Sequence, residues 1–393
     1  MKRPVKNLGY CLLILLPGGF LLFLGWAYLL LSGPPPYLTY AAGLLGLAGL
    51  LALCLRVLLG QRSKKAVLIG YLALCAAAAL YVGHGVWRDQ IPTLDDRLRT
   101  LWQYQPYAPD TRAVRLEEEP TLRLADNLLL PTMDGATALY PVYAAFAQAV
   151  YPEREYSLYE GPVVCSNTVG AYERLIDREV DVIFAAAPSQ DQLDAARAAG
   201  MELHLTPIGR EAFVFFVNSQ NPVQGLTVEQ VRGIYSGKIT NWREVGGQNR
   251  PIRAFQRAAN SGSQSALERL MGDTPLIEPE KEDVVADMGG IISRVASYRN
   301  YQNAIGFSFR YYSTQMVEND QIRLLALNGV EPTRQTIRDG SYPISSEFYA
   351  VTAAPIGLPA PQSYQTRLAA LLDWILSPQG QWIIEQTGYV ALN

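Results

Sequence analysis

The sequence has 393 residues, enough for more than one domain, and its formal net charge of −3 gives no sign of a nucleic-acid-binding chain. This average hides a division, because residues 7–87 carry very few charges whereas the remainder has the composition of an ordinary soluble protein rich in Tyr. Of the 4 Cys, only Cys165 lies in that remainder, so no disulfide framework is expected there. Without a CxxC motif or a cluster of Cys and His, we expect no zinc site and no other cofactor.

Three long apolar runs open the chain: Tyr10–Leu31, Tyr37–Gly60 and Ala66–Trp87. The second run carries one charged residue, Arg56, and the other two carry none. Each run is long enough to cross a bilayer, which takes about 20 apolar residues. Core helices are rarely so long and uncharged, and the first run is longer than the apolar part of a cleaved signal peptide. We therefore predict three transmembrane helices, at about 10–31, 37–60 and 66–87, in a membrane domain 1–88.

The charges that flank these runs predict their orientation. Positively charged loops remain in the cytoplasm. The loop 32–36 after the first run has no charge. The N-terminus is therefore expected in the cytoplasm, and everything after Trp87 on the extracellular or periplasmic side. The basic residues that carry this prediction are Lys2, Arg3 and Lys6 before the first run, and Arg62, Lys64 and Lys65 after the second.

The rest of the chain reads as a linker followed by an α/β domain. Residues 89–120 are rich in Pro, Asp and Arg and are predicted to be a juxtamembrane linker. From 121 to 393, short β-like runs alternate with helical patterns, which predicts helices covering mainly parallel sheets. About 270 residues is large for one core, so two lobes are expected. The expected strands are 182–186, 203–208, 213–217, 252–255, 305–309 and 348–352, and the expected helices are 139–150, 169–179, 190–199, 228–236, 263–271 and 364–376.

Three of the expected helices begin with the same local pattern, a hydroxyl residue beside a small residue. The three segments are Asp134–Ala138, Ser166–Gly170 and Arg257–Gln264. A helix start leaves backbone N–H groups unpaired and carries a partial positive charge, so an anion can bind there if small residues let it approach. One such segment is more often a simple cap, and Ser261 with Gln264 fits a capping box. Three together, with the guanidinium of Arg257, favour an oxyanion site.

These segments resemble the phosphate-binding proteins that feed phosphate-specific ABC transporters. The resemblance runs from about Leu122 to Asn393. Its most specific stretch is 226–245, LTVEQVRGIYSGKITNWREV. The other matching stretches are Asp134–Tyr143, the R-x-x-x-S-G-[ST] loop at Arg257–Ser263, Trp374–Gln381 and Gly388–Val390.

The resemblance implies a two-lobed type II periplasmic-binding-protein fold that closes over its ligand. It implies crossings between the lobes near Phe213–Asn218 and Ser345–Thr352, with lobe 1 at about 121–217 and 346–393 and lobe 2 at about 218–345. Ala138 and Gly262 would bind through their backbone N–H groups, and Thr168 takes a position that is usually Ser. The ligand donors that the family implies are Thr137, Ala138, Thr168, Arg257, Ser261, Gly262 and Ser263.

One departure from the family concerns selectivity. Family members carry an Asp that accepts a hydrogen bond from protonated phosphate, and the matching position falls on Ala186 or Ala187. A carboxylate there repels an anion with no proton to share, so its absence weakens the distinction between phosphate and sulfate. The candidates for residues that remodel the pocket in its place are Ser189, Glu347, and Arg310 with Tyr312.

The sequence therefore predicts a membrane-anchored substrate-binding protein, not an enzyme, that captures phosphate or a similar oxyanion for an ABC-type importer. Its expected partners are the anion, an ABC permease and the lipid bilayer, with no nucleic acid. A receptor that signals through a membrane partner, with another anionic ligand, is the alternative. A Ser-His-Asp hydrolase would depend on His204, the one His outside the apolar runs, and no G-x-S-x-G or phosphate-loop motif is present.

Overall fold

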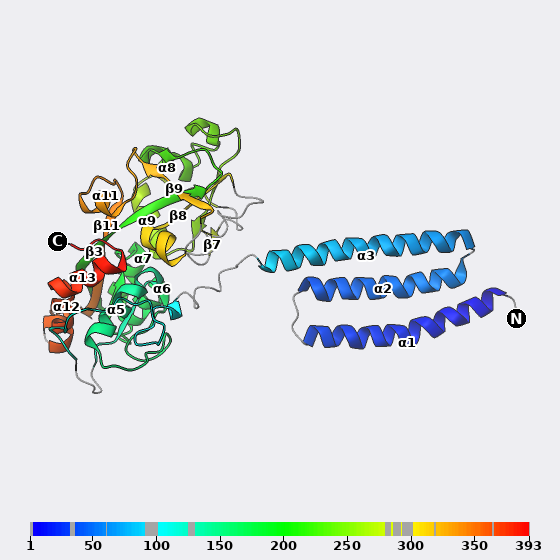
Figure 1. Cartoon of the computed structure of the whole chain (residues 1–393), viewed down its shortest axis with the longest axis horizontal. Coiled ribbons are helices and arrows are strands. Elements are labelled where there is room, and N and C mark those ends of the chain that lie inside the picture. Colours follow the sequence, from blue (N-terminus) through cyan, green and yellow to red (C-terminus); the bar gives the residue numbers. More distant parts are fainter. Residues whose placement is uncertain are drawn as a thin grey trace. The chain divides into compact units, whose positions relative to one another are not determined.

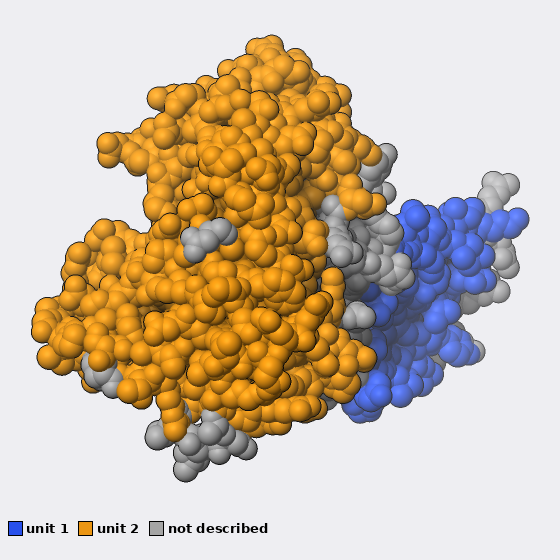
Figure 2. All heavy atoms as spheres, turned by 60° about the vertical axis from the view of Figure 1, so that its left-hand side comes forward, with its two compact units in different colours: residues 1–93 blue, residues 94–393 orange. Residues whose placement is uncertain are grey.

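The computed structural model of the chain describes residues 3–31, 36–59, 61–90, 101–124, 130–279, 284–285, 292, 302–317, 320–363 and 365–392. The chain forms two compact units, Met1–Thr93 and Leu94–Asn393, which are coloured separately in Figure 2. Residues 91–100 of the predicted linker 89–120, and Tyr364, the expected first residue of a helix, lie outside the described residues.

The first unit consists of three long helices, α1 (Arg3–Leu31), α2 (Pro36–Leu58) and α3 (Gln61–Gln90), drawn in blue in Figure 1. Each contains a stretch long and apolar enough to cross a membrane: Tyr10–Leu29, Tyr37–Leu58 and Ser63–Gly83. The three helices predicted from the apolar runs are therefore confirmed as helices.

Helix α2 packs against both α1 and α3, and its glycines lie at the contacts. A Cβ atom on Gly43 would lie 3.1 Å from the indole nitrogen of Trp26, and one on Gly49 would lie 3.2 Å from the hydroxyl of Tyr71. Small residues let neighbouring helices approach closely where no hydrophobic effect drives them together. Large apolar side chains such as Leu16 and Leu80 point outward and are more than two-thirds exposed. Such a surface suits lipid better than water.

The second unit is built on a mixed sheet in the order β1-β2-β11-β3-β8-β5, with β9 also paired to β3. The strands β1 and β2 are parallel, as are β5 and β8, whereas β3 and β11 run antiparallel to each of their neighbours. The expectation of mainly parallel sheets is therefore wrong. The strands are β1 (Met133–Gly135), β2 (Val182–Ala185), β3 (Met201–Asn218), β5 (Arg253–Ala254), β8 (Ala304–Phe309), β9 (Ile322–Leu324) and β11 (Ser345–Pro355).

Strand β3 is long because it serves two halves of this sheet. Its residues 201–212 pair with β11, and its residues 213–218 pair with β8 and β9. The two strands expected at 203–208 and 213–217 are thus parts of one strand. We call β1, β2, β11 and the start of β3 the first half of the sheet, and the end of β3 with β5, β8 and β9 the second half.

Helices cover both halves, and most of their buried side chains form one core that spans them, while the buried face of α6 forms a second, smaller cluster with β2. Tyr143 stacks on Phe184 in the first half, with ring centroids 5.1 Å apart, and Phe213 packs against Phe307 in the second half, at 5.4 Å. The α-helices are α5 (Tyr140–Val150), α6 (Asn167–Ile176), α7 (Gln190–Ala198), α8 (Val228–Tyr235), α9 (Gly262–Met271), α11 (Arg334–Arg338), α12 (Thr366–Leu376) and α13 (Pro378–Thr387). Short strands are β4 (Gly225–Leu226), β6 (Gln256–Arg257), β7 (Val284–Val285) and β10 (Ala326–Leu327).

Residues 101–124, most of which the sequence analysis assigned to a linker, pack on the second unit. Leu101 and Tyr104 are 1% and 4% exposed and belong to its core. The hydroxyl of Tyr107 donates to the carbonyls of Gln148 and Tyr151, at 2.7 and 2.8 Å. This described segment therefore contributes to the folded domain, because most of its apolar side chains pack into it, although Trp102 is exposed.

Candidate anion-binding site

A pocket of about 250 Å³ lies where the two halves of the sheet meet. Strand β3 supplies Glu211 and strand β11 supplies three consecutive residues, although side chains of a regular strand alternate between two faces. A register shift in β11, between Phe348 and Tyr349, accompanies this arrangement. The lining residues are Ala136, Thr137, Ala138, Leu139, Asn167, Thr168, Val169, Ala186, Glu211, Arg257, Ala258, Ser261, Gly262, Phe309, Tyr312, Ser346, Glu347, Phe348 and Tyr389.

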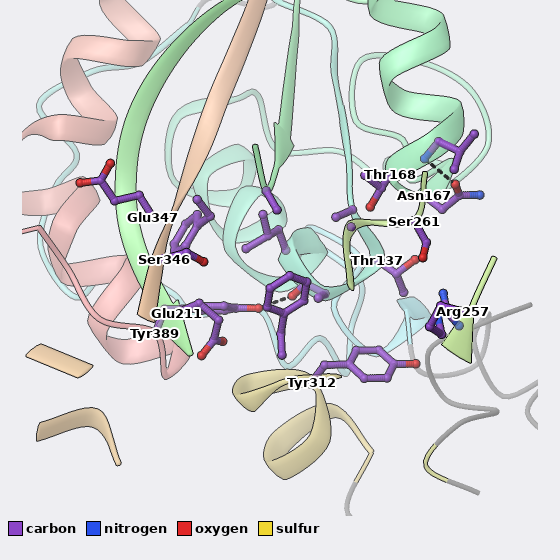
Figure 3. Close-up of a pocket in the computed structure, with 18 of the residues that line it drawn as sticks. Thr137, Asn167, Thr168, Glu211, Arg257, Ser261, Tyr312, Ser346, Glu347 and Tyr389 are labelled. Atoms are coloured by element: carbon purple, nitrogen blue, oxygen red, sulfur yellow. Dashed lines mark hydrogen bonds between the residues drawn. The ribbon is translucent and has the colours of Figure 1, made fainter. Parts of the chain in front are cut away.

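The pocket brings together Thr137, Ala138, Thr168, Arg257, Ser261 and Gly262, all predicted from the sequence as ligand donors. Figure 3 shows Thr137, Thr168 and Ser261 gathered at one end, with Arg257 beside them. Ser263, the remaining predicted donor, is fully buried but does not line the pocket. Its hydroxyl has no hydrogen-bond partner among the described residues.

The carboxylate of Asp134 joins the first two of the predicted loops. It accepts hydrogen bonds from the backbone N–H of Gly135 at 2.7 Å, and from the N–H and hydroxyl of Ser166 at 2.8 and 2.6 Å. Arg174 of α6 completes the set, with its Nη1 2.7 Å from Asp134 Oδ2. Asp134 is fully buried, so this set of partners stabilises a charge that would be costly alone. It fixes the loop of Thr137 to the start of α6.

At the start of α6, the donor available to a ligand is mainly the hydroxyl of Thr168, and less the backbone N–H groups. Asn167 has a positive φ of 85°, and its side-chain oxygen accepts from Val169 N–H at 2.9 Å and Gly170 N–H at 3.3 Å. The N–H groups expected to face an anion are thus partly occupied by Asn167, as the dashed line in Figure 3 marks for one of them. The hydroxyl of Thr168 points toward the start of α9. A Cβ atom placed on Gly262 would lie only 3.2 Å from Thr168 Oγ1.

The start of α9 forms half of the expected capping box. Ser261 Oγ accepts from the N–H of Gln264 at 3.3 Å. The side chain of Gln264 turns instead to the loop before the helix, where it accepts from the N–H of Arg257 at 2.9 Å and donates to Gln256 at 3.2 Å. Gln264 therefore ties the backbone of Arg257 to the helix start. Arg257 itself is 8% exposed.

Hydrogen bonds also join elements of the two halves beside the pocket. The hydroxyl of Ser189, at the start of α7, donates to the side-chain oxygen of Asn260 at 2.9 Å. The side chain of Gln192 donates to the carbonyl of Asn260 at 3.3 Å, and Arg269 of α9 donates to the carbonyl of Ala187 at 3.3 Å. Ser189, which the sequence suggested for the pocket wall, thus lies in this contact and does not line the pocket.

Of Ala186 and Ala187, the two positions that the resemblance matched to the family's Asp, Ala186 lies at the pocket wall. Ala186 lines the pocket, and its carbonyl accepts from the hydroxyl of Tyr172 at 2.8 Å. The carboxylates that line the pocket within the described residues belong to Glu211 and Glu347. Figure 3 shows both at the opposite side of the pocket from Thr168 and Ser261.

Glu211 is a site residue that the sequence reasoning missed. It is 4% exposed, and its two oxygens accept from the backbone N–H groups of Ala212 at 2.8 Å and Tyr311 at 3.1 Å. Burial raises the pKa of Glu211 to about 7, although these two hydrogen bonds and the nearby Arg310 act in the opposite direction. The sequence held one signal for a buried role of Glu211: it is charged, yet it lies between Ile208 and the apolar run 213–217, which were both expected in strands.

Arg310 and Tyr312, also named from the sequence, have different surroundings. The guanidinium of Arg310 donates to the carbonyls of Pro332 at 2.9 Å and Gly388 at 3.5 Å. It therefore holds the segments of Pro332 and Gly388 together near Glu211. Tyr312 lines the pocket and begins a π-helical turn that ends at Met316. Turns of this kind are rare in proteins overall, but many of those that occur lie at functional sites. No cluster of metal-binding side chains is found in the described part of the chain.

Fold and site define a binding domain with a pocket at the junction of two half-sheets, and the comparisons agree. Residues 129–379 match the family described as PBP superfamily domain, which is well over half of the chain. The chain therefore belongs to this superfamily, as the resemblance predicted. It carries a domain like that of the phosphate-binding proteins, which are binding proteins and not enzymes, behind three long apolar helices.

Several characterised relatives are named for phosphate. The phosphate-binding protein PstS of Staphylococcus epidermidis is 26% identical over 232 residues, which are 58% of this chain and 68% of that protein. PstS of Staphylococcus saprophyticus is 28% identical over 236 residues, 58% of this chain and 70% of its own length. A crystal structure from Clostridium perfringens, of a phosphate ABC transporter substrate-binding protein with bound phosphate, has a TM-score of 0.50 at 23% identity. It covers 67% of this chain and 100% of its own, and it shares the fold.

Proposed function

We propose that the chain is a membrane-tethered binding protein that captures phosphate or a similar small oxyanion outside the cytoplasm. The observation that carries this proposal is the gathering of three hydroxyl groups, from Thr137, Thr168 and Ser261, beside the buried Arg257. Hydroxyl, guanidinium and backbone N–H groups are hydrogen-bond donors, and an oxyanion consists of acceptors. The names of the relatives support the same ligand class. We assign the backbone N–H groups of Ala138 and Gly262 to the same anion, with Ser263 buried beside them.

The binding movement follows from the two strands that cross between the halves. We infer that residues 121–217 with 346–393 form one lobe and residues 218–345 the other. Strand β3 changes partners at Ala212 and Phe213, and β11 begins at Ser345, which supports a hinge there. The hydrogen bonds from Ser189 and Gln192 to Asn260 would form when the lobes close over the anion.

The three apolar helices support a membrane tether with the N-terminus in the cytoplasm. Basic residues before α1 and at the start of α3 are the motivation, because such loops remain inside. The binding domain then lies on the outer side. Trypsin added to intact spheroplasts should remove it while a cytoplasmic marker survives. A binding domain that is degraded only after the cells are lysed would overturn this orientation.

An ABC permease is the partner we propose, because the relative from Clostridium perfringens is described as a substrate-binding protein of such a transporter. Cells that lack this chain should take up labelled phosphate more slowly, and the intact gene should restore the rate. Unchanged uptake together with a lost response to phosphate starvation would favour the receptor instead.

Calorimetric titration of the full chain in detergent tests the binding function. Wild-type protein should bind inorganic phosphate at one site. Arg257→Ala should weaken binding by about 2–5 kcal/mol, roughly thirtyfold to several thousandfold, because it removes a charged donor from a buried anion. Thr137→Val should cost less, because the backbone donors near it remain. Wild-type affinity in the Arg257→Ala variant would show that the anion binds elsewhere.

A further inference from the structure

The pocket is larger than one small oxyanion requires. A water molecule occupies about 30 Å³, so 250 Å³ holds roughly eight of them. A phosphate-sized anion at the end formed by Thr137, Thr168 and Ser261 displaces only part of this water. This volume is not explained by an open arrangement of the two proposed lobes, because Ser189 of one lobe and Asn260 of the other are hydrogen-bonded beside the pocket. The space that remains can hold a second group of the same ligand.

Aromatic rings and a carboxylate line that remaining space. The carboxylate belongs to Glu211, with the ring of Tyr389 beside it, whereas Tyr312 extends toward Arg257 (Figure 3). The other two rings that line the pocket are those of Phe309 and Phe348. Tyr389 is held by Phe348, with centroids 5.1 Å apart, and by its hydroxyl, which donates to the carbonyl of Ala138. Tyr389 and Phe348 are therefore held in place without a ligand. Faces of aromatic rings attract cations, and they do so more strongly where water is excluded.

Glu211 is a buried carboxyl group whose ionised form would be stabilised by a cation. Within the described residues no ion pair of Glu211 is found, and its hydrogen-bond partners are two backbone N–H groups. The neighbouring guanidinium of Arg310 donates to the carbonyls of Pro332 and Gly388. A buried carboxylate is costly unless it is paired with an opposite charge. Each Glu211 oxygen keeps acceptor capacity after one hydrogen bond, because a carboxylate offers about four lone-pair sites.

The other lining carboxylate is less suited to this task. The hydroxyl of Tyr349 donates to Glu347 at 3.3 Å. In Figure 3 the Glu347 carboxylate is directed away from Thr137 and Arg257, whereas Glu211 lies beside Tyr389. One buried carboxylate among aromatic rings suits a single positive charge on an organic group better than a metal ion, which prefers several oxygen ligands.

Resting on the proposed function, we propose that the ligand is a small zwitterion, a phosphate ester or phosphonate that carries an amine. Its oxyanion lies at Thr137, Thr168, Arg257 and Ser261, and its ammonium group lies at Glu211 between the aromatic rings. Glu211 then selects for the amine of the ligand, in the same way that the donor end of the pocket selects for its oxyanion. A ligand with both groups matches both ends, whereas inorganic phosphate leaves the end at Glu211 filled with water.

Calorimetry of the full chain in detergent, with four probes, tests this proposal. The probes are inorganic phosphate, ethyl phosphate, glycerol phosphate and phosphoethanolamine. Phosphoethanolamine and ethyl phosphate have similar size and differ by the amine. Phosphoethanolamine should bind roughly ten- to a hundredfold more tightly than ethyl phosphate, because it adds a hydrogen bond between charged groups. Glu211→Gln should remove this advantage of phosphoethanolamine over ethyl phosphate. Glu202→Gln, at an exposed position of the same strand, is the matched control and should keep the advantage.

Two other outcomes are informative. Equal binding of ethyl phosphate and phosphoethanolamine, or an equal gain for glycerol phosphate, would overturn the assignment of the amine and leave the proposed function standing. Binding of none of the four probes to folded protein would overturn the proposed function itself. The comparison of probes on the wild-type chain requires no substitution, so it decides the matter even if Glu211→Gln does not fold.

Discussion

Asp134 and Arg174 form an ion pair, with Nη1 of the arginine 2.7 Å from Oδ2 of the aspartate, in which the carboxylate is fully buried and the guanidinium is 29% exposed. The same carboxylate accepts from the backbone and hydroxyl of Ser166. One side chain thus holds the Thr137 loop and the Thr168 loop in a fixed relation. Asp134 therefore positions the proposed anion site without lining the pocket.

Asp134→Asn should therefore damage both stability and binding. The amide has one oxygen where the carboxylate has two, and its NH₂ group must face donors from Ser166 or Arg174. Breaking a buried pair typically costs about 3–5 kcal/mol, measured as the loss in free energy of unfolding by denaturant. Phosphate affinity should fall with it. Glu179→Gln is the control, because Glu179 pairs with the same Arg174 at 3.0 Å but is 58% exposed. An exposed pair is worth about 0–1 kcal/mol, and equal losses in both variants would contradict this role of Asp134.

We expect the alanine at position 186 to weaken the selectivity of the pocket for phosphate over sulfate. Among the described residues, the donor end of the pocket lacks a carboxylate, so the O–H of a protonated phosphate is accepted there only if a hydroxyl of Thr137, Thr168 or Ser261 gives up its own bond to the anion. An unsatisfied hydroxyl costs about 1–3 kcal/mol, or roughly one to two decades in affinity. The wild-type chain should therefore distinguish phosphate from sulfate poorly, and Ala186→Asp should weaken sulfate binding far more than phosphate binding. Competition titrations near neutral pH measure this. A preference of several decades for phosphate in the wild type would mean that another acceptor reaches the anion.

The N-terminal boundary of the second unit is testable by truncation. A chain that begins at Leu94 keeps Leu101, Tyr104 and Tyr107 in the core, whereas one that begins at Thr121 loses them. Burial of a large apolar side chain is worth about 1.5–3 kcal/mol, so losing Leu101 and Tyr104 should cost roughly 3–6 kcal/mol. Thermal melts should show a cooperative transition for the longer chain and a lower midpoint for the shorter one. Identical midpoints would return residues 101–120 to the role of a linker.

Stability should also depend on pH through Glu211. Its pKa is raised from 4.5 to about 7, so between these values the folded chain keeps a proton that the unfolded chain has released. The free energy of unfolding should then fall as pH rises through this window, by at most about 3 kcal/mol, and should level off above it. The charged or titratable groups around Glu211 are Arg310, Tyr311 and Tyr389.

Glu211→Gln removes that titration while keeping a similar shape. Urea denaturation at several pH values from 4 to 8 should show a flatter profile for this variant than for the wild type. The same pH dependence in both proteins would mean that other groups cause it. Binding of an amine-bearing ligand should strengthen as Glu211 ionises.

The sequence predicted the local features well because they are local in origin. The apolar runs alone determine α1 to α3, and the stretch 257–263 forms its loop through Gln264, only a few residues away. What it missed depends on distant partners. Glu211 looks like a surface residue of a strand until Tyr311 and β11 cover it. The segment 101–124 has a linker composition, and its place is set by α5 and α13. Helix α13 was missed although Pro378 at its first position is a typical start.

The most direct test of the anion site is a crystal structure of the chain with arsenate, whose anomalous scattering marks its position. Arsenate has the shape and charge of phosphate. A single strong peak within hydrogen-bonding distance of Thr137, Thr168 and Ser261, with Arg257 against it, is the expected result. A peak elsewhere on the second unit, or none at saturating arsenate in crystals with the pocket open to solvent, would contradict the account.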